Sequence, residues 1–148
     1  MYLLDTTHCL QIIFGFPQFN EKRKELENVT LATCTIVRGE LLYGVFKSER
    51  PNENLCKVEN FLESMRVYPI DNQTANIYGE LKCEILDQFG PKLKSKRRNV
   101  KTESLGFKDN DIWIASTAIQ HSLTVISADN HFVRLIGLKG LKVENWSI

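Results

Sequence analysis

Four acidic side chains of this sequence stand where burial in a folded domain would carry a high cost in free energy. Two follow short apolar runs, one lies within an apolar segment of helical spacing, and one opens such a segment. Mg²⁺ and Mn²⁺ are hard cations that prefer oxygen ligands, so a cluster of these carboxylates is typical of a site for one or two such ions. Asp5 and Asp129 follow the apolar runs, Glu40 lies within the helical segment, and Asp111 opens another such segment.

Each acid also has a structural explanation. Asp5, Asp111 and Asp129 could each cap a helix N-terminus, where an acidic side chain contributes about 0.3–1 kcal/mol. The neighbouring Asp109 could cap in place of Asp111. Glu40 is harder to explain in this way, because an acid in the middle of an apolar helix face gains nothing from capping. A structural role for all four acids is therefore harder to sustain than such a role for any one of them.

The composition is that of an ordinary globular domain with an uneven charge distribution. The chain has 148 residues, of which 43% are hydrophobic and 25% charged, enough for one domain with its own core. Its net charge is +1, but six of its 19 basic residues stand in the segment 92–101 without an acid among them. The other 13 basic residues face 18 acidic ones, which predicts a mildly acidic body with one basic segment.

The sequence also predicts a cytoplasmic protein that does not enter a membrane. Its N-terminal segment lacks the positive residues of a signal peptide, and Asp5 interrupts the first apolar run. No apolar stretch approaches the roughly 18–20 residues that a membrane span needs. The cysteines show no spacing typical of a zinc site, and we expect most of them to be reduced core residues. They are Cys9, Cys34, Cys56 and Cys83.

Short runs rich in β-branched residues alternate with segments of helical period, which predicts an α/β domain. We expect three layers, with a mostly parallel β-sheet flanked by helices on both faces. The stretch from 91 to 108 has little apolar periodicity and is expected to be a loop or mobile insert within a single domain, 1–148. The expected strands are 2–5, 30–34, 66–70, 124–127 and 142–144, and the expected helices are 7–14, 20–27, 36–47, 52–65, 72–89 and 110–121.

This order of elements brings the acids together. Ligands of open α/β sheets bind outside the carboxyl ends of the strands, where Asp5 ends the first strand and Asp129 follows a later one. Asp111 starts a helix whose apolar stripe includes Ile114, and Glu40 shares a stripe with apolar residues of its own helix. Four acids from four elements are therefore expected to meet in one pocket.

The same residues form a series of motifs along the chain: Tyr2–Thr6, Gly39–Gly44, Asn110–Ala115, Val125–Asp129 and Glu144–Trp146. In this order they resemble the motifs of the PIN domain, and in particular of the VapC-type toxins of bacterial toxin–antitoxin pairs. The resemblance covers essentially the whole chain. Each of the first four motifs carries one of the four candidate acids, and the last resembles the closing motif of the family.

The resemblance departs from the family pattern at two places. Thr7 stands where the family often has Asn or Ser, although its hydroxyl can still hydrogen-bond the first acid. The segment 91–108 is longer than the short connection common in these toxins, which leaves open whether Asp109 assists Asp111.

The resemblance implies a metal-dependent endoribonuclease of a type II toxin–antitoxin system, with RNA as substrate and a cognate antitoxin as partner. Hydrolysis of a phosphodiester needs an activated water and neutralisation of charge on the phosphate, and one or two divalent ions can supply both. We assign Asp5, Glu40 and Asp111 as the main ligands of Mg²⁺ or Mn²⁺, and Asp129 as a weaker or second-ion ligand; all four are the candidate catalytic residues. The hydroxyls of Thr6, Thr7 and Ser127 are candidates to orient carboxylates or water.

Two further segments suggest partners. The basic segment is expected to guide RNA, with Lys94, Lys96, Arg97 and Arg98 as candidate phosphate contacts, although a solvated loop is the simpler explanation of such a run. The helix 36–47 offers more apolar positions than one face requires, and the end of the next helix adds others. We expect a second copy of the chain or an antitoxin segment to cover part of this surface. Its residues are Leu41, Leu42, Val45, Phe46, Phe61, Leu62 and Met65.

Two other functions remain possible on the sequence alone. An aspartyl-phosphate phosphatase would need a second acid two residues after Asp5, where this chain has Thr7. A catalytically inactive PIN-like module that binds RNA or a partner would keep the fold without cleavage. The histidines His8, His121 and His131 form no evident nucleophile–base set, and we expect them to be partly exposed surface residues.

Overall fold

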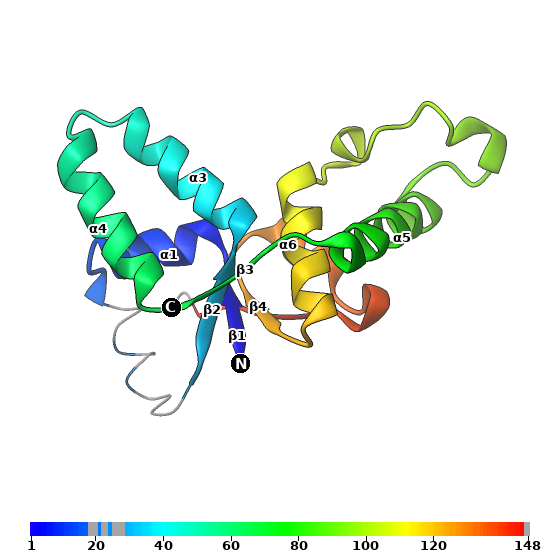
Figure 1. Ribbon diagram of the computed structural model, residues 1–148. Helices are drawn as coiled ribbons and strands as arrows, with labels where there is room; N and C mark the ends of the chain where they lie inside the picture. The colour runs from blue at the N-terminus through cyan, green and yellow to red at the C-terminus, as the bar shows by residue number, and fades with distance from the viewer. Residues whose placement is uncertain (18–20, 22–23, 25–28, 147–148) are drawn as a thin grey trace.

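The computed structural model describes residues 1–17, 21, 24 and 29–146, and its centre is a five-stranded sheet (Figure 1). All four strand pairs are parallel, in the order β3-β2-β1-β4-β5. The first strand of the chain is thus the middle strand, with Tyr2 opposite Leu31 on one side and Thr124 on the other. The strands are β1 (Tyr2–Leu4), β2 (Leu31–Cys34), β3 (Arg66–Tyr68), β4 (Thr124–Ile126) and β5 (Lys142–Glu144).

Helices cover both faces of this sheet, which confirms the expected α/β architecture. In Figure 1, α1, α3 and α4 lie on one side of the strands, and α5 and α6 lie on the other. The expected helix 20–27 falls largely outside the described residues, and α7 was not expected. The helices are α1 (Thr6–Ile13), α3 (Thr35–Phe46), α4 (Pro51–Glu63), α5 (Asn72–Phe89), α6 (Asp109–Gln120) and α7 (Asn130–Leu135), with short 3₁₀ helices η1 (Lys94–Lys96), η2 (Thr102–Leu105) and η3 (Leu138–Gly140).

The core agrees with the apolar pattern of the strands. Leu3, Leu4 and Val125 are fully buried, as expected for central parallel strands that have helices on both faces. Within the described part of the chain, no helix has both the length and the apolar character needed to cross a bilayer.

The expectation of core cysteines is correct for two of the four. Cys9 and Cys34 are buried, but Cys56 and Cys83 are exposed, and all four are free thiols. Cys56 and Cys83 lie on α4 and α5, helices whose outer faces meet solvent, so their positions in mixed polar and apolar segments did not imply burial.

The segment 91–108, which was expected to be a loop or mobile insert, is an arm of loop and two short 3₁₀ helices, η1 and η2. Its last apolar residue, Phe107, is buried with its ring 5.0 Å from that of Phe89 and the guanidinium of Arg134 4.1 Å above it. Arg97 donates from Nε to the carbonyl of Pro91 at 2.6 Å and forms an ion pair with Asp87. A few anchors of this kind order a segment without producing a helical or strand period in the sequence.

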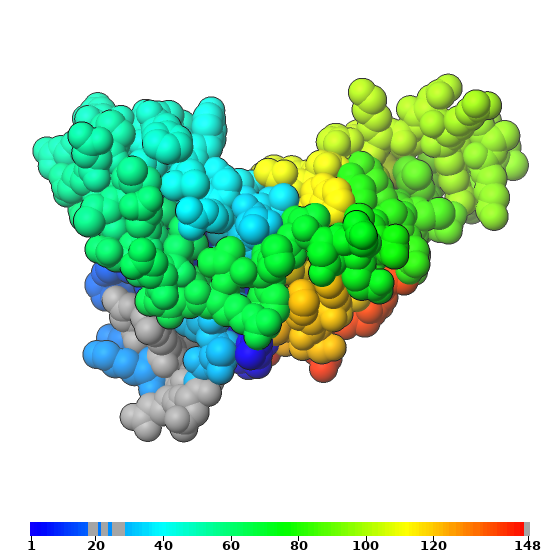
Figure 2. Space-filling view, viewed as in Figure 1, coloured from blue at the N-terminus to red at the C-terminus, as the bar shows by residue number. Residues whose placement is uncertain are grey.

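The arm gives the molecule a second lobe. In Figure 1 it extends beyond the end of α5, away from α3 and α4, and the chain then returns to the start of α6. The space-filling view shows a broad hollow between this arm and the lobe that α3 and α4 form (Figure 2). The arm therefore ends beside the N-terminus of α6, which carries Asp111.

Candidate metal site

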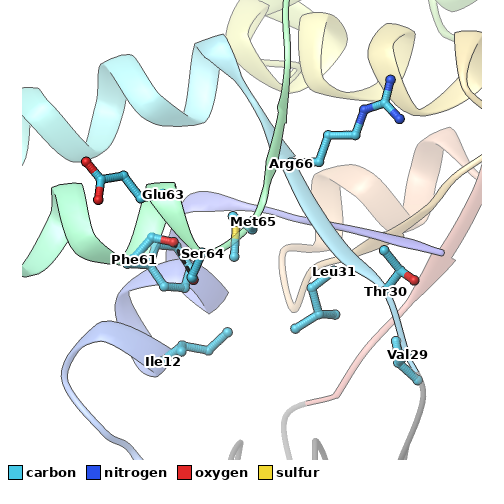
Figure 3. Close-up of a pocket in the computed structure, with 9 residues that line it drawn as sticks. All are labelled: Ile12, Val29, Thr30, Leu31, Phe61, Glu63, Ser64, Met65 and Arg66. Carbon is cyan, nitrogen blue, oxygen red and sulfur yellow. Dashed lines mark hydrogen bonds between the residues drawn. The ribbon is translucent and has the colours of Figure 1, made fainter.

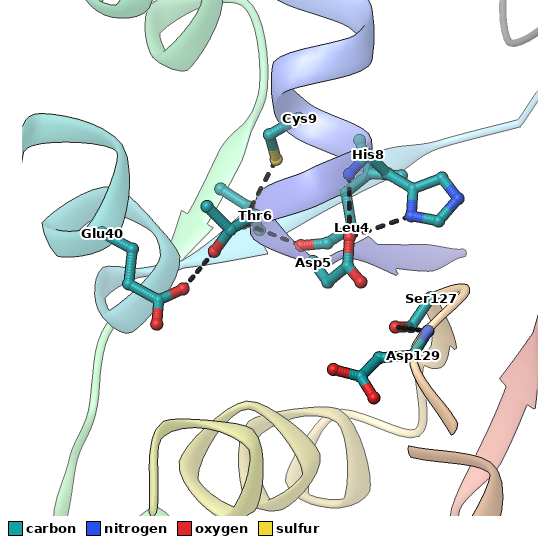
Figure 4. A network of polar contacts seen from close by, with 9 residues as sticks. Leu4, Asp5, Thr6, His8, Cys9, Glu40, Ser127 and Asp129 are labelled. Atoms are coloured by element: carbon teal, nitrogen blue, oxygen red, sulfur yellow. Dashed lines mark hydrogen bonds and ion pairs between the residues drawn. The ribbon is translucent and has the colours of Figure 1, made fainter. Parts of the chain in front are cut away.

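The four acids line a single pocket at the carboxyl-terminal edge of the sheet. Figure 4 shows Asp5, Glu40 and Asp129 directed toward a common space, with α6 along its border. The pocket has a volume of about 120 Å³. The structure thus brings together the residues that the sequence proposed, whereas their roles stay a prediction. The full lining is Asp5, Thr6, Thr7, Glu40, Lys108, Asp111, Ile114, Asp129 and Phe132.

Asp5 and Asp129 cap helices and also line the pocket, so a capping role and a place in the candidate site are compatible. Asp5 Oδ1 accepts the backbone N–H of His8 at 2.8 Å at the start of α1. Asp129 Oδ1 accepts the backbone N–H of His131 at 2.9 Å at the start of α7, and its own N–H donates to Ser127 Oγ at 3.1 Å. Capping satisfies one oxygen of each carboxylate and leaves the other available to the pocket.

Glu40 is held from two sides. The hydroxyl of Thr6 donates to its Oε2, and the amide of Asn110 donates from Nδ2 to Oε1 at 2.7 Å. These bonds tie the carboxylate of α3 to the starts of both α1 and α6. The sequence argument chose Thr6 but did not assign Asn110 to the site; the signal was its position directly before Asp111 in the third motif.

Asp111 lacks such support. Its Oδ2 is buried and has no hydrogen-bond partner in the described structure. Burial raises the pKa of Asp111 to about 6, and the negative charges of Asp129 and Glu40 add to this effect against the opposing charge of Lys108. A buried carboxylate oxygen without a donor is the feature that a bound cation would satisfy.

Lys108 brings a positive charge to the acids, and the sequence argument did not identify it. Its Nζ lies 4.0 Å from Asp129 Oδ2, and its side chain is largely exposed at the pocket. Asp109, by contrast, does not line the pocket. Its Oδ1 accepts from the hydroxyl of Tyr78 at 2.5 Å and from Lys82 Nζ at 2.7 Å, so it fastens α6 to α5.

The donor set fits a hard divalent ion. All four acids offer oxygen, and Asp111 carries an unsatisfied one. In the described residues, no three carboxylate, imidazole or thiol groups are arranged as a ready-made metal site. Mg²⁺ usually keeps several waters and binds one or two carboxylates directly. Asp5, Glu40 and Asp111 would hold such an ion directly or through water, with Asp129 as a weaker or second-ion ligand.

The comparison with known proteins agrees with this geometry. The family model described as the PIN domain matches residues 2–138. The chain belongs to the PIN domain family. It is 32% identical over 148 residues to Ribonuclease VapC2 of Rickettsia felis, covering 99% of this chain and 98% of that protein. It is 26% identical to the tRNA(fMet)-specific endonuclease VapC of Salmonella typhimurium, with 98% and 97% covered. The crystal structure of VapBC2 from Rickettsia felis bound to a promoter DNA fragment superposes with a TM-score of 0.77 at 30% identity, covering 99% of this chain and 98% of that one.

The histidines of this PIN domain differ in part from expectation. His121 and His131 are partly exposed, as expected, but His8 is fully buried. Its position three residues after Asp5 places it on the inner face of α1, against the first acid. The sequence argument expected a partly exposed surface residue here and did not consider this spacing.

A second, larger hollow lies at the amino-terminal side of the sheet of this PIN domain (Figure 3). Its volume is about 420 Å³, and its lining mixes apolar side chains such as Ile12 and Phe61 with one acid, Glu63, and one base, Arg66. It lacks the convergent carboxylates of the first pocket. The acidic residues that could bind a metal ion line the pocket at the carboxyl-terminal edge instead.

The raised pKa of Asp111 predicts how metal-free stability depends on pH. The folded-state pKa of Asp111, about 6, exceeds its ordinary value of 3.8. The contribution of its protonated carboxyl group to folding stability is therefore fully present below pH 3.8 and is lost as the pH rises through 6. We expect Asp111→Asn to unfold like the parent at pH 4 in EDTA. At pH 7.5 it should be more stable, by an amount on the order of 1–3 kcal/mol. Urea unfolding at a series of pH values measures this difference.

Asp109→Asn is the matched control, two residues away in the same helix. Burial favours a higher pKa for Asp109, but its bonds from Lys82 and Tyr78 outweigh this and lower the pKa. The ionised carboxylate of Asp109 therefore contributes to folding stability at neutral pH, and Asp109→Asn should lower the free energy of unfolding there. If the free energies of unfolding of the parent and Asp111→Asn depended on pH in the same way, the raised pKa of Asp111 would be contradicted.

Proposed function

We propose that this PIN domain is a metal-dependent endoribonuclease and the toxin of a type II toxin–antitoxin pair. The observation that carries the proposal is the convergence of four acids from four elements on one pocket, with Asp111 Oδ2 buried and unpaired. Its similarity to a protein named Ribonuclease VapC2 supports the same activity. The phosphatase alternative lacks support, because Thr7 occupies the place of the second acid that it would need.

Different residues of the pocket would have different roles in phosphodiester hydrolysis. Bound Mg²⁺ or Mn²⁺ would supply an acidified water and neutralise charge on the phosphate. Thr6 and Asn110 hold Glu40 in one orientation, so that its carboxylate faces the pocket before substrate arrives. Lys108 stands at the pocket and offsets the repulsion between the acids and a polyanionic substrate.

Removing the charge of a proposed ligand should abolish cleavage without unfolding the protein. We expect Asp5→Asn, Glu40→Gln and Asp111→Asn each to lower the single-turnover rate by at least about 100-fold, the upper end of the loss seen when only a supporting residue of a metal site is removed. Cleavage of a mixed RNA substrate is measured with Mg²⁺ or Mn²⁺, in EDTA, and after the metal is restored.

Glu59→Gln is the control, because Glu59 is exposed on α4 and does not line the pocket. It should cleave like the parent. An Asp111→Asn protein with undiminished activity would refute the site. An inactive parent that still binds RNA would favour the alternative, a PIN-like binding module without catalysis.

We propose that the arm contacts RNA through phosphates, with one change to the residues first considered. Lys94, Lys96 and Arg98 are exposed, whereas Arg97 is engaged with Pro91 and Asp87 of the arm itself. Arg97 thus shapes the arm, and the other three cations are available. Because η1 lies toward the outer end of the arm in Figure 1, these contacts would fall on RNA beyond the cleaved bond.

Replacing Lys94, Lys96 and Arg98 together by Gln should raise KM and leave metal affinity unchanged. Each lost contact to single-stranded RNA lowers the slope of log K against log salt by about 0.7, so three contacts correspond to about 2. Binding and cleavage are measured from low to high salt. Lys142→Gln, on exposed β5, is the control. Salt profiles that coincide with the parent would leave the arm without a role in RNA binding.

We propose that an antitoxin segment binds the groove beside Glu40. This groove, of about 240 Å³, is lined mainly by apolar groups of α1, α3 and α4, and Glu40 borders both it and the acidic pocket. Of the residues first expected to form an apolar surface here, Leu41, Val45 and Leu62 belong to the core, whereas Phe46 is exposed. A homodimer would cover part of the same apolar surface. The exposed residues are Leu10, Phe14, Phe16, Tyr43 and Phe46.

Phe14→Ser and Phe46→Ser should each weaken antitoxin binding, because buried aromatic side chains at interfaces often contribute 2 kcal/mol or more, about 30-fold in Kd. The antitoxin is taken from a small reading frame next to the gene for this chain, and its Kd and inhibition of cleavage are measured. Val133→Ser, exposed on α7, is the control. Unchanged inhibition in both Phe variants would place the interface elsewhere, and a chain that sediments as a monomer at high concentration would exclude the homodimer.

A further inference from the structure

The buried imidazole of His8 is bonded to the first acid of the pocket. His8 Nδ1 lies 2.9 Å from Asp5 Oδ1, and the ring has no exposed surface. An ionised carboxylate only accepts hydrogen bonds, so the hydrogen of this contact is on Nδ1. His8 is therefore a donor to Asp5, from the first turn of α1.

This bond adds something that helix capping does not require. The backbone N–H of His8 already donates to the same oxygen at 2.8 Å, and that bond alone completes the cap. With two donors on Oδ1, the other oxygen of Asp5 points away from His8, toward the space between Glu40 and Asp129 (Figure 4). The imidazole thus determines which oxygen is presented to the pocket.

We propose that His8 is a positioning residue, which holds Asp5 so that only Oδ2 is available to a divalent ion. The terminal torsion of an aspartate is broad, and one backbone bond restrains it weakly. A second donor in a buried setting restrains the carboxylate plane and strengthens the contact. Carboxylates that bind metal ions are usually held by such partners. This proposal rests on the proposed metal site and adds the residue that orients its first ligand.

Three variants of the full chain test this role. His8→Leu removes the donor and fills the buried space with an apolar side chain, and His8→Phe does so with a ring. His8→Asn restores an N–H near the position of Nδ1. Cys9→Ala is the matched control: Cys9 is equally buried on α1, but its thiol is directed to Thr33 Oγ1 at 3.9 Å.

The readouts are Mn²⁺ affinity, followed by electron paramagnetic resonance at fixed pH, and kcat and KM for RNA cleavage. Melting temperatures establish that each variant is folded. We expect the Kd for Mn²⁺ to rise about 10–100-fold in His8→Leu and His8→Phe, with a fall in kcat and little change in KM. His8→Asn should recover most of the affinity, and Cys9→Ala should melt earlier but bind Mn²⁺ like the parent.

Folded His8→Leu or His8→Phe that binds Mn²⁺ as tightly as the parent would reduce His8 to a packing residue and overturn the proposal. Failure of His8→Asn to recover affinity would do the same. A parent that binds Mn²⁺ but cleaves no RNA would refute the proposed ribonuclease activity alone. A parent that binds no Mn²⁺ would refute the metal site, and the role of His8 with it.

Discussion

The central constraint on this structure is the gathering of four carboxylates at one edge of a parallel sheet. Asp111 experiences this most directly, because burial and the charges of Asp129 and Glu40 raise its pKa to about 6. The charges of Lys108 and His131 oppose this rise in pKa, and Lys108 Nζ lies 4.0 Å from Asp129 Oδ2. Such a pocket lowers the stability of the metal-free protein and favours an ion that accepts oxygen ligands.

Residues of neighbouring elements hold three of these carboxylates in place through hydrogen bonds. Asp5 receives two donors from His8, Glu40 receives Thr6 and Asn110, and Asp129 receives the first turn of α7. Asp111 Oδ2 is the buried carboxylate oxygen of the pocket that has no donor among the described residues. The arrangement is therefore organised around the three supported acids, and the fourth is the group with most to gain from a cation.

The second half of the molecule contributes a basic arm beside the acidic pocket. Asp109 fastens α6 to α5 through Tyr78 and Lys82, and the ring of Trp113 stacks on Tyr78 at 3.8 Å. This junction fixes the start of α6, so the arm that precedes it returns to a defined position beside Asp111. The basic arm consequently joins the body of the molecule beside the acidic pocket, and the two regions carry opposite charges.

The sequence by itself determined the architecture and the four acids, because apolar periodicity and strand ends depend on local spacing. It also assigned Thr6 correctly to the neighbourhood of an acid. Only the tertiary structure decided what meets each acid from another element: Asn110 reaches Glu40 across 70 residues, and Lys108 reaches Asp129. The same holds for Phe107 and Arg97, whose partners order the arm, and for His8, which the fold buries against Asp5. Burial and partner choice are properties of the assembled elements, and a single sequence carries no direct record of them.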